Sequence, residues 1–393
     1  MSVIGGTLFG FDLSSMSAII ATNQYKSYFN QGPHGYPFSD APQCSDPRSL
    51  IQGALVSGLL TDAFGRKSSI QTGSLIWVIG SVISCAAQNF PMLVVGRFIN
   101  GICVGICSAQ VPVYVAELAL AHKGGLVVGA PQWAITWAIL ITFYISYGCS
   151  FLEGTASFRA PWALQTIPVI FFFFGIFWMP ESPRWLAKQD RWDKCQKILM
   201  LIHADNNPDD DLVRMELQRL REACDMDRIQ SNVSFTELVK PPMLWRFHIG
   251  VFVQIWSQLT CINVIMYYIT FVFGMAGLSG NNNLVASSIN YVINVFVTIP
   301  ALLYLDKVGR RPILLMGSIS LTVWWFLCAG LMGGYGSSAP PGGLNHIAEE
   351  SWSITGTPAK VVIACSYLVV ASFAPSWGPV SWVYSPELFR LRL

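Results

Sequence analysis

The sequence predicts an all-α membrane protein in which two bundles of transmembrane helices are joined by a polar connector. The chain is 53% hydrophobic and only 12% charged, whereas a soluble domain carries roughly 25% charged residues. The charge is concentrated, because residues 181–246 hold 23 of the 46 Lys, Arg, Asp and Glu residues. Elsewhere the chain consists of apolar runs of about 20 residues, a length that crosses the hydrocarbon core of a bilayer.

Ten apolar runs are the expected transmembrane segments. They lie at about 3–22, 50–61, 70–88, 92–116, 125–148, 161–179, 247–273, 284–305, 312–333 and 358–383. The second run is anomalous, because only about a dozen apolar residues separate Arg48 from Asp62. It is too short to span a bilayer unaided.

The predicted division is a first bundle at 1–180, a cytoplasmic connector at 181–246, and an incomplete second bundle at 247–393. Within the connector, residues 190–203 and 212–228 mix charged and apolar residues at helical spacing. We therefore expect two or three short amphipathic helices. We interpret their charge as a solvated face rather than a partner-binding surface.

The basic residues indicate the orientation. One side of the predicted segments has the turns near Arg66 and Arg310 and the whole connector. The other side has few basic residues, namely Lys26, Arg48, Arg159 and Lys360. By the positive-inside rule, the N-terminus and the connector are cytoplasmic.

Composition and motifs exclude several classes. A net charge of +2 without a basic face gives no reason to expect nucleic acid. There is no His-rich metal cluster, nucleophile elbow or phosphate-binding Gly-x-x-x-x-Gly-Lys, so an enzyme is not expected. The ten cysteines follow no metal-ligand spacing, and we interpret them as packing residues.

The two arms contain related sequences. Residues 61–67 (TDAFGRK) match 305–311 (LDKVGRR), and residues 114–118 (YVAEL) match 384–388 (YSPEL). Repeated halves on either side of a cytoplasmic connector are typical of a transporter whose substrate lies between them, near the middle of the membrane.

The repeated turn combines a flexible glycine with charge. Gly65 and Gly309 permit a tight reversal of the backbone. Arginines beside them can pair with carboxylates on neighbouring helices. Because the turn occurs twice, we predict a conformational latch, formed by Asp62, Arg66, Glu117, Asp306, Arg310 and Glu387.

Asp12 and Arg97 are isolated ionisable residues within the first and fourth segments. An unpaired charge at the centre of a transmembrane helix costs roughly 2.5–3.5 kcal/mol on insertion scales. The sequence therefore predicts that the two side chains form an ion pair.

Further motifs carry a specific resemblance. They are GGTLFGFD (5–12), GRK (65–67), GRF (96–98), VPVY (111–114), PESPRW (180–185), QLTCIN (258–263), GRR (309–311), WGPVSW (377–382) and PELF (386–389). In these motifs the chain resembles the sugar porters of the major facilitator superfamily, most closely the fungal high-affinity glucose and monosaccharide transporters. The resemblance implies the two-bundle fold of that superfamily, with about ten of an expected twelve helices, and it adds Glu181 and Arg184 to the latch.

The resemblance also implies a monosaccharide site between the halves. The matching positions are Gln132, Gln258, Asn263, Asn294, Trp382 and Phe9. Amides suit hydroxyls because they both donate and accept hydrogen bonds, and an indole can cover the apolar face of a sugar. The alternatives are amides that only hold helices together, core packing for Phe9, and a role for Asn290 that is shared with Asn294 or replaces it.

The same resemblance implies that transport is coupled to protons. In proton-coupled sugar porters the aspartate matching Asp12 binds the proton, and the arginine matching Arg97 retains or releases it. Proton symport is therefore preferred, with facilitated diffusion and a structural ion pair as alternatives. We expect no metal and no cofactor other than protons as the coupling ion. The expected partners are a monosaccharide and the lipid bilayer, with no obligate protein partner, in a multi-pass protein of the plasma membrane.

Some positions depart from the family pattern. Ser257 stands where a glutamine is common, and Cys261 stands where glycine is usual. The chain ends directly after its tenth segment, as a shortened form of a twelve-segment transporter would. A non-transporting sugar sensor and an inactive truncated relative therefore stay open as alternatives.

Overall fold

The computed structural model describes residues 2–15, 19, 25, 28, 64–118, 124–203, 211–229, 241–278, 280–339, 344 and 352–390. The second predicted segment, 50–61, and Asp62 lie outside these residues. The structure is helical apart from one two-stranded antiparallel hairpin, formed by β1 (Ser337–Ser338) and β2 (Trp352–Ser353), in the part of the chain that it describes.

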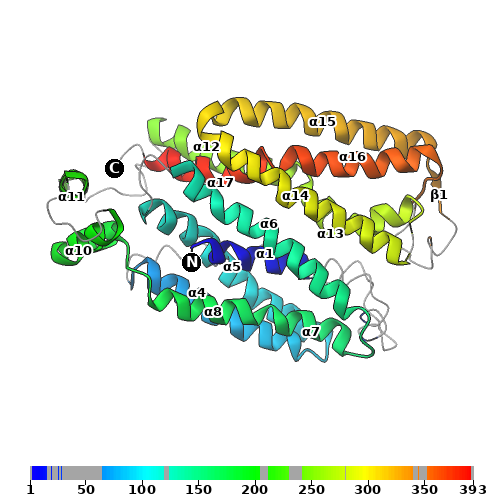
Figure 1. Ribbon diagram of the computed structural model, residues 1–393, viewed down its shortest axis with the longest axis horizontal. Helices are drawn as coiled ribbons and strands as arrows, with labels where there is room; N and C mark the ends of the chain where they lie inside the picture. The colour runs from blue at the N-terminus through cyan, green and yellow to red at the C-terminus, as the bar shows by residue number, and fades with distance from the viewer. Residues whose placement is uncertain are drawn as a thin grey trace.

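The helices form two bundles that lie side by side (Figure 1). The first contains α1 (Ser2–Ser15), α4 (Arg66–Cys85), α5 (Phe90–Leu118), α6 (Gly124–Cys149), α7 (Ala156–Leu164) and α8 (Thr166–Phe177). The second contains α12 (Pro241–Leu259), α13 (Ile262–Met275), α14 (Gly280–Val308), α15 (Arg310–Tyr335), α16 (Thr357–Phe373) and α17 (Trp377–Arg390). This arrangement confirms the predicted fold class.

Seven stretches of the described chain are long and apolar enough to cross a membrane. They are α4, α5, α7 with α8, α12 with α13, α14, α15, and α16 with α17. Each coincides with an expected segment, although α12 begins at Pro241, six residues before the predicted boundary. The 26-residue helix α6 matches a further segment, and its length of about 39 Å also suffices to span.

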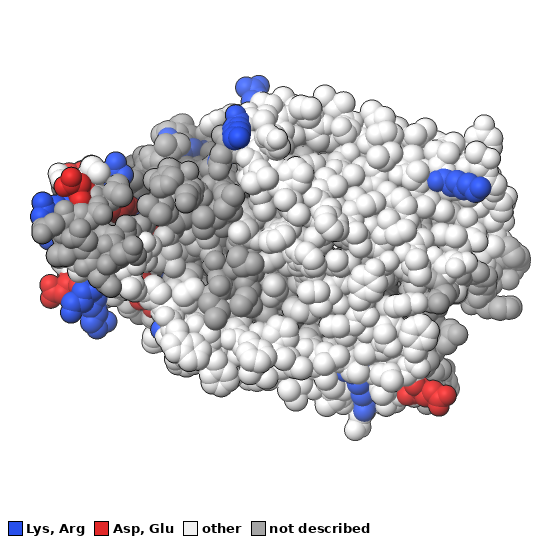
Figure 2. Space-filling view, viewed as in Figure 1, with Lys and Arg blue, Asp and Glu red and all other residues white. Residues whose placement is uncertain are grey.

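Three helices of the connector lie at one end of the bundles (Figure 1). They are α9 (Pro183–Lys188), α10 (Trp192–His203) and α11 (Asp211–Ile229), as the mixed apolar and charged pattern predicts. Figure 2 shows charged side chains gathered at this end, whereas the surface over the bundles is almost uncharged. That distribution fits helices that lie in lipid with one polar end in water.

The connector helices have their own small apolar core. Leu186, Leu199, Val213 and Leu220 pack there around Cys195, whose side chain is fully buried. Burial, with a smaller contribution from nearby Cys224, raises the pKa of the Cys195 thiol to about 11. This thiol is therefore protonated at neutral pH, and its Sγ donates to the Pro183 carbonyl at 3.3 Å inside this core, so Cys195 is a packing residue, as we expect of the cysteines.

Small residues let α1 lie directly on α6. A Cβ added to Gly6 would be 2.5 Å from the carbonyl oxygen of Pro131, and one added to Gly10 would be 2.5 Å from that of Ile135. Both distances are too short for a real contact, so only glycine fits at either position. On its other side α6 packs against α14 and α17, and it therefore connects the first bundle to the second.

We predict that Gly6→Val weakens the fold, because the new side chain would overlap the backbone of α6. Overpacking of this kind costs about 1–3 kcal/mol. Gly330→Ala on α15 is the matched control, since an added Cβ meets nothing within 4 Å there. Thermal unfolding of the purified protein should occur several degrees lower for Gly6→Val and no lower for the control. Equal melting temperatures would contradict the close packing of α1 on α6.

Candidate functional site

A buried ion pair joins α1 to α5. Arg97 Nη1 lies 2.8 Å from Asp12 Oδ1, and the two side chains are only 1% and 7% exposed. The pairing expected from sequence is therefore present. Removing one member of a buried pair typically costs about 3–5 kcal/mol, because the other charge is left uncompensated. Protonation of Asp12 would abolish the same attraction without removing the side chain.

An indole ring covers one face of the Arg97 guanidinium. Its Cζ lies 5.7 Å from the centre of the Trp162 ring on α7, within the range of a cation–π contact. Arg97 thus keeps a favourable neighbour when Asp12 is neutral.

A break between α12 and α13 positions two of the predicted amides. Cys261 at the break has φ 58°, a left-handed conformation that favours glycine and explains why glycine is usual there in the sugar porters. Across the break, Asn263 Nδ2 donates a hydrogen bond of 2.7 Å to Gln258 Oε1. In the described residues, Gln258 Nε2 and Asn263 Oδ1 make no hydrogen bond.

Two other predicted amides lie on adjacent helices. Gln132 Nε2 on α6 lies against the backbone of α17, where a Cβ on Gly378 would be 3.2 Å from it. Asn294 on α14 is 5% exposed, and its side chain has no hydrogen bond to the part of the chain described here. Trp382 is partly buried on α17, one turn beyond Gly378, at the edge of the apolar core shared by both bundles.

These side chains belong to neighbouring helices. Helix α6 packs against α14 and α17, α12 against α17, and α13 against α14. The membrane-embedded parts of these five helices carry no Lys, Arg, Asp or Glu. Neutral amides with spare donors and acceptors suit an uncharged molecule that carries hydroxyl groups. The side chain of Phe9, on α1, lies outside the described residues.

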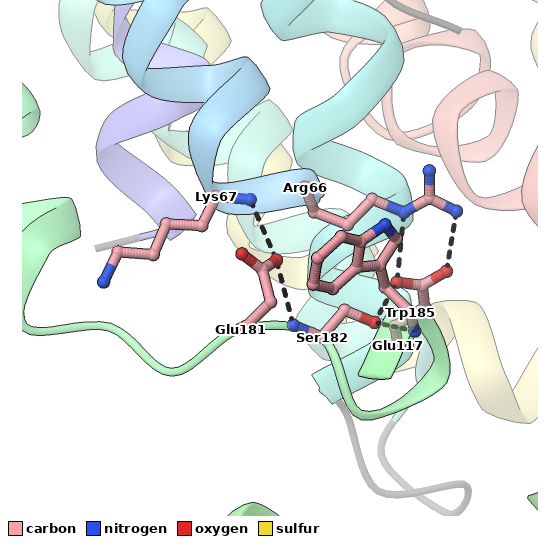
Figure 3. A network of polar contacts seen from close by, with 6 residues as sticks. All are labelled: Arg66, Lys67, Glu117, Glu181, Ser182 and Trp185. Carbon is pink, nitrogen blue, oxygen red and sulfur yellow. Dashed lines mark hydrogen bonds and ion pairs between the residues drawn. The ribbon is translucent and has the colours of Figure 1, made fainter. Parts of the chain in front are cut away.

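A polar network, called here the connector network, lies at the end of the first bundle that meets the connector helix α9 (Figure 3). Arg66 at the start of α4 donates to both carboxylate oxygens of Glu117 on α5, through Nη2 at 3.2 Å and Nε at 3.4 Å. Ser182 Oγ donates to Glu117 Oε2 at 2.6 Å and accepts from the backbone N–H of Trp185 at 3.3 Å. Ser182 therefore caps α9 and ties it to the membrane bundle.

The side chain of Glu181 caps the N-terminus of α4. Its Oε1 accepts hydrogen bonds from the backbone N–H groups of Lys67, at 3.1 Å, and of Ser182, at 3.2 Å. The first residue before α4 is Gly65, which has φ 93° and no side chain to cap the helix. A carboxylate at a helix N-terminus satisfies free N–H groups and the positive end of the helix dipole.

The second repeat shares the backbone conformation of this turn. Gly309, before α15, has φ 86° and ψ 161°, close to the 93° and 170° of Gly65. Arg310 Nη1 donates to the Leu305 carbonyl at 3.1 Å. The side chains of Asp306 and Glu387 lie outside the described residues, as does Asp62. Arg184 makes no hydrogen bond or ion pair with the residues that are described.

Three members of the connector network belong to motifs quoted from the sequence but were not among the predicted site residues. Ser182 bridges α9 and Glu117, Lys67 Nζ donates to the Phe177 and Met179 carbonyls at 2.9 and 3.0 Å, and Tyr114 Oη donates to the Pro180 carbonyl at 2.6 Å. Ser182 had a recognisable signal, because serine followed by proline is typical of a helix N-terminus. The other two contacts depend on tertiary packing.

The fold and these sites define a membrane protein of the major facilitator superfamily. A solved structure of the proton:xylose symporter XylE with bound 6-bromo-6-deoxy-D-glucose superposes with a TM-score of 0.79 at 26% identity, over 97% of this chain and 79% of that one. The family model "Sugar (and other) transporter" matches residues 1–393. The chain belongs to this sugar transporter family.

Curated relatives agree with the assignment. The MFS glucose transporter mfs1 of Aspergillus flavus is 42% identical over 406 aligned residues, which cover 100% of this chain and 75% of that protein. The high-affinity glucose transporter of Kluyveromyces lactis is 41% identical over 392 residues, covering 99% of this chain and 71% of that protein.

We predict that Ser182→Ala loosens α9, because it removes both the cap and the bond to Glu117. The connector should then be cut faster by trypsin, by a factor of about 5 if these bonds contribute about 1 kcal/mol. Thr72→Ala is the control, since Thr72 Oγ1 bonds only to a carbonyl of its own helix. Equal cleavage of the wild-type protein and the Ser182 variant would show that this contact does not hold the connector.

Proposed function

We propose that this protein transports a monosaccharide, of the hexose class, across a membrane by alternating access of its two bundles. The observation that carries the proposal is the hydrogen-bonded pair of Gln258 and Asn263 at the break between α12 and α13. The pair leaves a donor and an acceptor open. The glucose transporters named among its relatives support the choice of substrate.

The neutral character of the site supports the same substrate class. Sugars are uncharged and carry several hydroxyl groups, each of which can donate and accept hydrogen bonds. Amide side chains on α6, α12, α13 and α14 can donate hydrogen bonds to these hydroxyls and accept hydrogen bonds from them, without placing an unpaired charge inside the membrane. Trp382 would cover an apolar face of the ring.

We propose further that transport is proton symport and that Asp12 carries the proton. The buried pair with Arg97 supports this proposal, since only a change of protonation can neutralise Asp12 without moving it. The symporter named as a structural neighbour is a proton symporter. When Asp12 is neutral, α1 is released from α5 and can follow α6 during the rearrangement.

We also propose an orientation in the membrane and a cellular location for the protein. The charged end of the molecule, with α10 and α11, would lie in the cytoplasm together with the N-terminus. The network of Arg66, Glu117, Glu181 and Ser182 would then hold the cytoplasmic side closed in one transport state. The plasma membrane is the proposed location, and protons are the proposed coupling ion.

Uptake of labelled glucose by yeast that lacks hexose transport tests the proposal. The 393-residue chain should give saturable uptake that a protonophore abolishes. Gln258→Ala and Asn263→Ala should each lower uptake about 10-fold or more at equal surface level, because a bound hydroxyl would lose its partner. Gln218→Ala is the control, since Gln218 bonds only to Glu222 on the exposed face of α11.

A different experimental result would contradict each part of the proposal. Normal uptake by both amide variants would refute the site. Uptake that is insensitive to the protonophore would refute symport and favour facilitated diffusion. A normal surface level without any monosaccharide uptake would refute transport by this chain.

A further inference from the structure

Helix α14 carries a stripe of polar residues on its buried face. Successive members are three or four residues apart, so they lie on one side of the helix: Asn283, Ser287, Asn290, Asn294 and Thr298. Asn283 Nδ2 donates to the Thr270 carbonyl at 2.7 Å. The hydroxyls of Ser287 and Thr298 donate to carbonyls one turn back on α14 itself.

Asn290 differs from the three hydrogen-bonded members of this stripe, Asn283, Ser287 and Thr298. It is 0% exposed, and neither Nδ2 nor Oδ1 has a hydrogen-bond partner among the residues that the structure describes. A buried amide that is fully unpaired is unfavourable, because it loses its water without gaining a partner. In a membrane protein the surrounding lipid cannot supply one either. Such a residue is expected where a ligand completes its bonding.

The surroundings of Asn290 place it close to the proposed sugar site. Its neighbour Tyr291 packs on Phe143 of α6, with ring centres 4.8 Å apart, and donates to the Met266 carbonyl of α13 at 2.8 Å. One turn farther along α14 is Asn294, a proposed sugar contact. Asn290 is therefore next in sequence to a residue that contacts the first bundle, and it lies one turn from Asn294 on the side away from the connector.

A comparison with Asn100 shows what is particular to Asn290. Asn100 on α5 is also 0% exposed with an unpartnered amide in the described chain. However, a Cβ on Gly80 of α4 would be 2.1 Å from Asn100 Oδ1, so that amide is pressed between two helices of one bundle. Asn290 instead lies on α14 next to Tyr291, whose ring packs on Phe143 of α6, and this interface must open and close if the two bundles alternate.

We propose that Asn290 binds a pair of hydroxyls on neighbouring carbons of the transported sugar and so helps to determine which sugar is accepted. Nδ2 donates to one hydroxyl and Oδ1 accepts from the other. The contact forms in the state in which α6 and α14 separate and expose the side chain. This inference rests on the proposed monosaccharide transport. It adds to that site a residue that distinguishes sugars by a pair of hydroxyls on neighbouring carbons.

The variant Asn290→Leu tests the inference, because it keeps a side chain branched at Cγ and removes both polar groups. The protein is purified in lipid nanodiscs, and melting and binding are measured with glucose and its 1-, 2-, 3-, 4- and 6-deoxy analogues. Ser288→Ala is the matched control, since Ser288 Oγ bonds only to the Val285 carbonyl on its own helix.

We expect Asn290→Leu without sugar to melt no lower than the wild-type protein, because an unpaired amide is replaced by an apolar group. Its affinity for glucose should fall about 3- to 10-fold, as loss of one or two neutral hydrogen bonds implies. Two analogues deoxygenated at neighbouring carbons should bind equally well to the variant and to the wild-type protein. The control should behave as the wild-type protein with every sugar.

Other results would overturn the inference. A lower melting point of sugar-free Asn290→Leu would show that the amide has a structural partner. An unchanged affinity for glucose, or an equal loss for every analogue, would show that Asn290 contacts no particular hydroxyls. A wild-type protein that binds none of these sugars would refute the proposed function, and with it the sugar assigned to Asn290.

Discussion

The ion pair of Asp12 with Arg97 is the constraint on which the rest of the account depends. It holds α1 against α5 with a contact of 2.8 Å inside an apolar bundle, where neither charge could stand alone. Helix α1 also lies directly on α6 through Gly6 and Gly10, and α6 packs on α14 and α17 of the second bundle. We infer that the charge on Asp12 is linked in this way to the interface between the bundles.

The connector network contains one copy of a turn whose backbone conformation recurs in the second bundle. Gly65 and Gly309 adopt nearly the same backbone angles, so the repeated turn is a shared local structure. In the first copy the carboxylate of Glu181 occupies the space beside Gly65, where an added Cβ would be only 3.0 Å from Oε2, and it caps α4. Near Gly309 an added Cβ would meet nothing within 4 Å.

Sequence was sufficient for the features that repeat along the chain or satisfy a local rule. The lengths of the apolar runs predicted the membrane helices, and the mixture of charged and apolar residues at helical spacing predicted the connector helices. The isolation of two charged residues within apolar segments predicted the pairing of Asp12 with Arg97. Contacts such as Lys67 with the Phe177 carbonyl could not be predicted, because they depend on how α4 and α8 pack. The unpartnered state of Asn290 likewise depends on every neighbouring side chain, so only the folded structure distinguishes it from the bonded Asn283.

The most direct test of the account is the proton movement that accompanies sugar entry. Proteoliposomes containing the wild-type protein or Asp12→Asn would be given an inward sugar gradient while internal pH is followed. We expect the wild-type protein to acidify the interior as the sugar enters, and Asp12→Asn to admit sugar down its gradient without acidification. Sugar entry without proton movement in the wild-type protein, or unchanged acidification in the variant, would contradict the role of this ion pair in coupling.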